Sequence, residues 1–313
     1  MPCSRATDRT QARRQRRALA RAALLLCAPA LLRSSAAGTP LVAKDDRGRT
    51  VSLATAPRRI VSLAPSVTEI LFAIGAGPRV VAVTSYCDYP PEAKRLPKVG
   101  DYNTSIERVV AQRPDLIVAG AAANRTAVRN LEKLDRLRGR LFAIEPANLR
   151  ELYGAIARLG VLTGCSNGAA AVVARMKRVI ERTRASSAKL TARPSAVFLV
   201  QLDPLWVTGS GTFLADMIAA AGGRNLGAVV GKGYRGLALE RLIALDPEVI
   251  LSTHATLKEL RSRAGWSSMS AVRNGRVHVL GYDAVRPGPR LADAVASIAR
   301  LLRRRPDAPE RGP

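Results

Sequence analysis

Short apolar runs alternate with stretches of helical periodicity along most of the chain. The run over residues 59–64 has the nearly continuous apolar character of a buried strand. The stretch that follows places three apolar residues on one helical face, namely Ile70, Leu71 and Ile74. Ser66 and Glu69 stand at the start of this stretch with the spacing of a capping box, whose two side chains satisfy free backbone N–H groups. The pattern predicts a strand, a tight turn and a helix, and hence an α/β protein.

Residues 105–118 and 238–251 repeat one another at a constant offset of 133. The two copies share a glutamate, an alanine, a proline, an acidic residue after the proline and an isoleucine. Each copy predicts a short amphipathic helix, a proline that ends it and a buried parallel strand. Any α/β protein could contain two such units by chance, but here surface-type positions match as well as core positions. We therefore interpret the copies as equivalent units in two related halves.

A long stretch without proline separates the two halves. Residues 167–190 carry one apolar stripe at helical spacing, which consists of Val172, Val173, Met176, Val179 and Ile180. The predicted fold class is therefore α/β, with two α/β lobes of mainly parallel sheet joined by a single long helix and a ligand cleft between the lobes. We place the parts at 38–165 for the N-terminal lobe, 166–192 for the connecting helix, 193–305 for the C-terminal lobe and 306–313 for a disordered tail.

The first 37 residues have the pattern of an export signal. An arginine-rich stretch precedes an apolar run over residues 22–32, and small residues follow at 35–37. We expect cleavage near Ala37 and a periplasmic product. Cys27 follows a leucine rather than a small residue, so we do not expect a lipoprotein. Arg16 and Arg17 leave both the general and the twin-arginine export routes open.

The formal net charge of +26 raises the question of a nucleic-acid partner. Eight Arg and one Asp lie in residues 1–37, so seven of these net charges belong to the signal. The remainder is spread along the chain, and neither a helix-turn-helix nor a zinc-finger motif accompanies it. We expect no nucleic-acid partner, whereas a basic surface that faces acidic lipid headgroups remains an alternative.

The residues needed for metal or nucleophilic chemistry are scarce. The chain has only two histidines, His254 and His278, and no C-x-x-C pair, so we expect no metal site. Cys87 and Cys165 are the cysteines outside the signal, and we do not expect them to form a disulfide. Neither a G-x-S-x-G elbow nor a phosphate-binding Walker loop is present. We predict no enzyme and no cofactor, and a secreted enzyme is the remote alternative.

Several motifs over residues 58–302 together resemble the helical-backbone class of periplasmic binding proteins, which serve ABC importers of cobalamin, haem and siderophores. The motifs are I-V-S-L-A-P-S-V-T-E-I-L-F-A-I-G-A-G (60–77), S-Y-C-D-Y-P (85–90), R-P-D-L-I-V-A (113–119), A-A-G-G-R-N (220–225) and R-P-G-P-R-L (286–291). This resemblance implies that the ligand is held between the lobes with little closure on binding. The resemblance is strongest to the cobalamin-binding type, so we expect a corrinoid, cobalamin (vitamin B12), as ligand.

The resemblance also implies which residues touch the ligand. The candidates are Ser66, Tyr86, Tyr102, Trp206, Tyr282, Asp283 and Arg286. Flat aromatic faces and a few polar donors suit a broad corrin ring edged with amides. Ordinary core packing is the alternative for each aromatic residue.

Two other ligands of the same class remain open. The loop before Glu107 is one residue shorter than in the cobalamin-binding type, and Tyr102 stands where that type has a tryptophan. Haem would need an axial ligand, which Tyr86 or His254 could supply. A ferric siderophore, usually anionic, would suit Arg286 and Arg290.

Glu107 and Glu240 occupy equivalent positions in the two copies of the repeat. In the family that the chain resembles, such glutamates dock on arginines of an ABC permease dimer, one from each lobe. Two identical acids suit a two-fold partner, because each half of the dimer then meets the same geometry. The alternative is that both acids only favour the first turn of a helix. We expect docking of a monomer on the permease dimer in the inner membrane.

Overall fold

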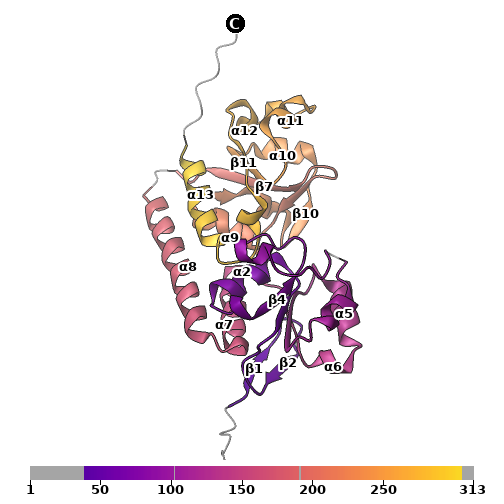
Figure 1. The fold of residues 1–313 in the computed structure, drawn as a ribbon. Helices are drawn as coiled ribbons and strands as arrows, with labels where there is room; N and C mark the ends of the chain where they lie inside the picture. The colour runs from indigo at the N-terminus through magenta and orange to yellow at the C-terminus, as the bar shows by residue number, and fades with distance from the viewer. Residues whose placement is uncertain (1–38, 102, 190–191, 305–313) are drawn as a thin grey trace, which may run out of the picture. The chain divides into compact units, whose positions relative to one another are not determined.

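The computed structural model of the protein describes residues 39–101, 103–189 and 192–304. The predicted export signal, the tail and Tyr102 lie outside the described residues. The described residues belong to one unit by their mutual contacts. Two sheets with helices packed around them account for most of this unit (Figure 1). No helix among the described residues has both the length and the apolar character that crossing a membrane requires.

The N-terminal lobe is built on a four-stranded sheet in which all strands are parallel. Its strands in spatial order are β4 (Val80–Val83), β3 (Ile60–Ser62), β5 (Leu116–Gly120) and β6 (Leu141–Ile144). Almost every residue of these strands is buried, as expected for a parallel sheet covered on both faces. An antiparallel hairpin of β1 (Leu41–Lys44) and β2 (Thr50–Leu53) precedes the sheet.

Short helices connect the strands of this lobe. They are α2 (Pro65–Ala73), η1 (Gly77–Arg79), α3 (Pro91–Lys94), α4 (Ile106–Ala111), α5 (Arg125–Glu132), α6 (Asp135–Arg138) and α7 (Leu149–Thr163). Helix α7 ends at Gly164, whose φ of 66° is a left-handed conformation that glycine adopts without strain. The chain can therefore turn directly into the next helix.

The C-terminal lobe has a mixed sheet. Its strands in spatial order are β10 (Tyr234–Gly236), β8 (Trp206–Thr208), β7 (Ser195–Gln201), β11 (Val249–Ser252) and β12 (Val277–Val279), with the short β9 (Arg224–Asn225) paired to β7. Strands β9, β7, β11 and β12 pair in parallel, whereas β8 and β10 are antiparallel. The helices are α9 (Phe213–Ala220), η2 (Leu226–Val230), α10 (Leu239–Leu245), α11 (Leu257–Ser262), η3 (Trp266–Ser268), α12 (Ser270–Arg273), η4 (Tyr282–Val285) and α13 (Leu291–Arg303).

One long helix, α8 (Ser166–Ser187), joins the two lobes (Figure 1). It packs against α7 of the first lobe and against α13 of the second. The predicted stripe is its contact face, because Met176 and Ile180 are buried and the three valines are partly buried against the same core. The predicted fold class, two α/β lobes joined by one long helix, is thereby confirmed.

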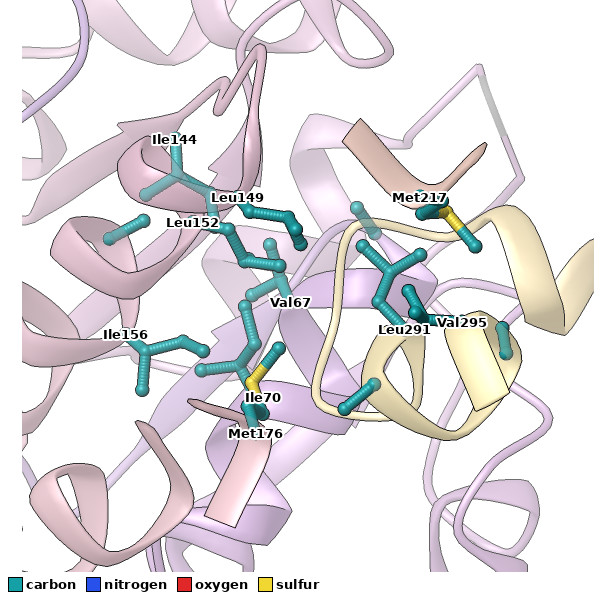
Figure 2. Packing of buried hydrophobic residues seen from close by; sticks show 14 of the residues in the cluster. Val67, Ile70, Ile144, Leu149, Leu152, Ile156, Met176, Met217, Leu291 and Val295 are labelled. Atoms are coloured by element: carbon teal, nitrogen blue, oxygen red, sulfur yellow. The ribbon is translucent and has the colours of Figure 1, made fainter. Parts of the chain in front are cut away.

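The core runs without interruption from one lobe to the other. Its main cluster includes residues of α2, α7, α8, α9 and α13, among them Val67, Ile70, Leu152, Ile156, Met176, Met217, Leu291 and Val295 (Figure 2). Burial of each such side chain contributes roughly 1.5–3 kcal/mol. Moving one lobe relative to the other would expose part of this shared core, so the packing favours a fixed arrangement.

The internal repeat is a structural repeat. Helix α4 and strand β5 fall at the same offset of 133 from α10 and β11. Arg113 and Asp246, which are equivalent by this offset, are the two non-glycine residues with positive φ among the described residues, at 48° and 41°. The helix-to-strand turn is therefore the same in both lobes.

The acidic residue after the proline makes equivalent hydrogen bonds in the two copies of the repeat. Asp115 accepts hydrogen bonds at 2.8 and 3.0 Å from the backbone N–H groups of Arg58 and Arg59, just before β3. Glu248 accepts from the backbone N–H and the hydroxyl of Ser195, at the start of β7. Each acid thus anchors the neighbouring parallel strand of its sheet, which explains why the repeat includes these polar positions.

Candidate functional site

A cavity of about 530 Å³ lies between the two lobes. The first lobe supplies residues at or just after the carboxyl ends of β3, β5 and β6, which are 64–66, 120–123 and 144–146. The second lobe supplies Tyr282 and residues 285–287, which follow β12. Loops at the carboxyl ends of parallel strands form the usual ligand site of α/β sheets.

The wall of the cavity is mostly apolar and built from small residues. The floor in the first lobe includes Ala64 and the run Gly120 to Ala123, whose short side chains leave room for a broad ligand. Within the described residues, the wall has one acid, Glu145, and one base, Arg286. Ser66 and the phenol rings of Tyr86 and Tyr282 add the other polar groups. Such a wall suits a flat, largely apolar molecule with a few hydrogen-bonding groups.

The structure brings four of the seven predicted ligand-binding residues into this wall. They are Ser66, Tyr86, Tyr282 and Arg286. Tyr86 is 44% exposed and comes from the first lobe, whereas Tyr282 is 65% exposed and comes from the second. Because both rings are exposed, neither is a core-packing residue.

The other three predicted residues lie elsewhere. Asp283 is next to the wall, and its carboxylate accepts a hydrogen bond of 3.0 Å from Arg290. Trp206 lies on β8, is 39% exposed and does not line the cavity. Tyr102 is outside the described residues.

Arg286 is held by two acids of the opposite lobe. Its guanidinium donates to Asp88 at 2.6 Å and reaches Glu69 at 3.5 Å. Burial disfavours the charged guanidinium, but hydrogen bonding and the charges of Asp88 and Glu69 outweigh burial, so the pKa of Arg286 lies above its ordinary value. The hydrogen bond from Arg286 also lowers the pKa of Asp88. The positive charge that Arg286 presents to the cavity is therefore already compensated.

Arg290 forms the second connection between the lobes. Its guanidinium donates to both oxygens of Glu69, at 2.9 and 2.6 Å, and it stacks on the ring of Tyr89 at 4.2 Å. The hydrogen bond with Glu69 raises the pKa of Arg290 against the effect of burial. We call Glu69, Asp88, Asp283, Arg286 and Arg290 the inter-lobe cluster.

The predicted capping box is wrong. Helix α2 begins at Pro65, its N-cap is Ala64, and no side chain caps it. Proline is favoured at the first helical position because its missing N–H would have no partner there. Ser66 is thus already inside the helix, and Glu69 turns to the arginines of the other lobe.

Sequence reasoning missed Glu69 and Asp88 as partners of Arg286, and Glu145 as a cavity residue. Arg290 and Asp88 stand inside the motifs R-P-G-P-R-L and S-Y-C-D-Y-P, so the motifs contained the signal. The pairing joins residues about 200 positions apart and could not be seen along the chain. Glu145 directly follows the strand β6, and its position at a carboxyl end of the sheet would have placed it.

The two predicted docking glutamates are both exposed in the first turn of a helix. Glu107 lies in α4 and Glu240 in α10. A backbone N–H at the start of α4 and the Ser105 hydroxyl, at 2.8 Å, lower the pKa of Glu107. Both carboxylates are therefore accessible to a partner, and Glu107 also stabilises its own helix start.

Candidate metal and redox groups are sparse in the part of the chain that the structure describes. It holds no group of three His, Cys, Asp or Glu side chains placed to bind a metal ion. His254 is exposed beside Ser252 and does not line the cavity. Cys87 is a buried free thiol, and Cys165 is a free thiol that accepts a hydrogen bond from Arg79.

Two α/β lobes, one connecting helix and an inter-lobe cavity define a two-lobed solute-binding protein. The family model described as periplasmic binding protein matches residues 60–284. This chain belongs to that family. The resemblance to the helical-backbone class of periplasmic binding proteins, which serve ABC importers, is confirmed. A family of solute-binding proteins gives no support to the enzyme alternative.

Three known proteins illustrate the likeness. The chain is 31% identical to the ABC transporter substrate-binding lipoprotein YvrC of Bacillus subtilis, over 84% of this chain and 85% of that protein. It is 31% identical to the vitamin B12-binding protein of Vibrio cholerae, over 78% of this chain and 89% of that protein. The solved structure of the periplasmic heme-binding protein RhuT from Roseiflexus aligns with a TM-score of 0.69 and 28% identity, over 78% of this chain and 97% of that one.

The family and the Bacillus relative bear on the predicted location of the protein and on the predicted absence of a lipid anchor. The family supports a periplasmic location. The Bacillus relative is a lipoprotein by name, which runs against the expectation of a product without a lipid anchor. Cys27 lies outside the described residues, so the absence of an anchor stays a prediction.

Proposed function

We propose that this substrate-binding protein captures a corrinoid, cobalamin, in the cavity between its lobes and delivers it to an ABC permease dimer. The observation that carries the proposal is the character of the cavity wall. The wall is mostly apolar, it is built largely from small residues, and the charge of its arginine, Arg286, is compensated by Asp88. A corrin is a broad apolar ring with neutral amides along its edge. Tyr86 and Tyr282, from opposite lobes, supply aromatic faces and hydroxyl groups for such a ring.

The charge of the wall argues against an anionic ferric siderophore. Binding such a ligand calls for cationic side chains that are free to pair with it. Arg286 is already paired with Asp88 and Glu69, and Arg290 with Glu69 and Asp283. A siderophore would have to compete with these acids, and Glu145 would repel it.

Haem is the second candidate, and one observation favours it. Tyr86 stands in the wall, and a tyrosine can serve as the axial ligand of haem iron. The likeness to the Roseiflexus heme-binding protein supports the same alternative. The propionates of haem would again meet a wall whose arginine is compensated, so the corrinoid remains the better fit.

A titration of residues 38–313 tests the ligand. We expect cyanocobalamin to bind one to one in calorimetry, and hemin and a ferric siderophore not to. Replacing Tyr86→Ala is expected to weaken cobalamin binding by about tenfold or more, because an aromatic face and a hydroxyl group are lost together. Trp206→Ala is the control and is expected to leave the affinity unchanged, since Trp206 lies outside the wall.

The variant Tyr86→Phe separates the two ligands. It keeps the aromatic face, so a corrinoid should still bind within a few-fold, whereas haem would lose its axial oxygen. Tight hemin binding that Tyr86→Phe abolishes would replace the corrinoid by haem. Binding of the siderophore alone would contradict the argument from the compensated wall.

We also propose that Glu107 and Glu240 dock the loaded monomer on the permease dimer. Their exposure, their equivalent places in the structural repeat and their separation onto two lobes support this proposal. Acid-to-arginine contacts of this kind fix orientation more than they add affinity. Ligand capture and docking are then carried by different residues and can be tested apart.

A further inference from the structure

A second recess, of about 680 Å³, lies on the N-terminal lobe away from the ligand cavity. Residues of α5 and α6 line it together with Arg49, which directly precedes β2. Figure 1 shows where α5, α6 and β2 lie in the first lobe. Its lining residues are Arg49, Thr126, Arg129, Asn130, Glu132, Lys133 and Arg138. None of these residues lines the cavity between the lobes. The proposed corrinoid site therefore does not account for this recess.

The one acid that lines the recess among the described residues, Glu132, is already neutralised. Glu132 accepts hydrogen bonds from Arg47 at 2.7 Å and from Arg49 at 2.6 Å. Arg49 also pairs with the buried carboxylate of Asp45 at 2.9 Å. Two arginines and two acids thus balance each other at one side of the recess. These pairs fix the backbone of the β1–β2 turn against α5.

Three cations of the same recess have no such balance. Arg129, Lys133 and Arg138 are all exposed, and none of them belongs to an ion pair within the described residues. A concave surface lined by charges of one sign concentrates the field more than a flat one does. The recess is therefore a place of local positive potential on the first lobe.

The cations of α5 repel one another, which destabilises the helix when no anion is bound beside them. Arg125, Arg129 and Lys133 follow one another at four-residue steps and share one face of α5 and its C-terminal end. Like charges at this spacing destabilise a helix by about 0.2–0.5 kcal/mol per pair. An anion held beside them would remove this repulsion. Thr126 and Asn130, one position further on, add neutral hydrogen-bond donors to the same recess.

An ordinary solvated basic face is the plainer interpretation, and α8 shows what it looks like. Arg178 and Arg182 are exposed there at the same spacing, yet neither lines the inter-lobe cavity, the α5 recess or three further recesses of the described residues. The α5 recess differs because its cations and neutral donors converge on one hollow. Guanidinium groups in such a hollow can bind a phosphate group bidentately.

We propose that this recess binds a multivalent phosphate group through Arg129, Lys133 and Arg138. The group belongs either to a free oxyanion or to the headgroup of an anionic phospholipid, because the two share the same chemistry. A lipid headgroup would hold the protein at the membrane in which an importer resides. The recess site is independent of which solute the inter-lobe cavity takes.

The test uses a triple variant, Arg129→Gln, Lys133→Gln and Arg138→Gln, in the chain of residues 38–313. A matched variant removes the same charge from exposed sites elsewhere, Arg178→Gln, Arg182→Gln and Lys258→Gln. Inorganic pyrophosphate, titrated by calorimetry at low salt, probes the free anion. Vesicles of phosphatidylglycerol in phosphatidylcholine, tested by co-sedimentation, probe the headgroup.

We expect the wild type to bind at least one of the two probes, and the recess variant to bind it at least about tenfold more weakly. The matched variant is expected to stay within about twofold of the wild type, because non-specific charge attraction is all it loses. Loss confined to vesicles would assign the lipid headgroup, and loss of pyrophosphate binding would assign a free anion. Equal losses in both variants, or no binding of either probe by the wild type, would overturn the proposal.

Two further measurements keep the result unambiguous. The thermal midpoint of each variant shows whether it is folded. The single substitution Lys133→Glu is a second variant that changes one residue of the recess instead of three. Cyanocobalamin is titrated into the recess variant as well. Its affinity should not change, so a failure of the corrinoid proposal and a failure of the recess proposal give different results.

Discussion

Glu69 is a carboxylate buried at the contact between the lobes. Its side chain is only 2% exposed, and its two oxygens accept hydrogen bonds from Arg290 while Arg286 approaches at 3.5 Å. Burying a carboxylate is unfavourable unless its charge is paired and its oxygens are hydrogen-bonded. The arginines meet both conditions, and their guanidinium groups keep partial access to water. Glu69 therefore links α2 to the segment before α13 and holds Arg286 in the cavity wall.

Replacing Glu69→Gln should lower the free energy of unfolding by about 1–3 kcal/mol, because the two arginines lose a buried countercharge while the shape is kept. The range is set below that of a fully buried pair, since both arginines are partly exposed. Urea denaturation measures the change. Asp283→Asn removes the exposed partner of Arg290 and should cost less than about 1 kcal/mol. Equally small losses in both variants would show that Glu69 contributes no more than a surface ion pair.

At the scale of elements, the repeated helix–strand units were predictable because both periodicity and residue identity recur at one offset. The structure extends the equivalence to the turns and the polar contacts. Arg113 and Asp246 form the same left-handed turn. Asp115 and Glu248 each anchor the neighbouring strand. The start of α2 was not predictable from the capping-box spacing. Pro65 sets the first helical position. The side chain of Glu69 points to Arg290, more than 200 residues away along the chain, and therefore does not cap the helix.

Helix α8 packs closely on the first lobe at two glycines, Gly168 of α8 itself and Gly160 of α7. A Cβ atom on Gly168 would lie 2.1 Å from the carbonyl oxygen of Ile74, which follows α2. A Cβ atom on Gly160 of α7 would lie 2.4 Å from the Cβ of Ala169 in α8. Only residues without a side chain permit these distances, so the position of α8 depends on them.

The variant Gly168→Ala should be destabilising by about 1–3 kcal/mol, because the new methyl group meets backbone that cannot move without disturbing α2. Thermal or urea unfolding measures this. Gly154→Ala in α7 is the matched control. Its new methyl group would meet only the flexible end of Arg158, at 3.3 Å, so the higher helix propensity of alanine should leave stability equal or up to about 1 kcal/mol higher. A neutral Gly168→Ala would mean that α8 can shift away from α2 at little cost.

At the scale of the whole molecule, three features connect the lobes. They are helix α8, the continuous apolar core and the inter-lobe cluster. The sequence predicted the two lobes and the helix, and four of the seven proposed ligand-binding residues reached the cavity wall. It could not predict that Arg286, the arginine of the wall, is compensated, because Asp88 and Arg286 are distant along the chain and meet only when both lobes are packed. The charge of the cavity is thus a property of the assembled molecule.

Fixed lobes keep Glu107 and Glu240 at a constant separation, as the proposed docking on a two-fold permease dimer requires. The double variant Glu107→Ala and Glu240→Ala should bind cobalamin within about twofold of the wild type, because neither residue lines the cavity. In vesicles that contain the cognate permease, the same variant should support uptake about tenfold or more slowly, because the acids that orient it are lost. Glu181→Ala with Glu259→Ala removes two acids from exposed helix pairs and should leave uptake intact. Normal uptake by the first variant would show that both glutamates serve only their own helices, and a loss of cobalamin binding would show that the ligand site and the docking face are coupled.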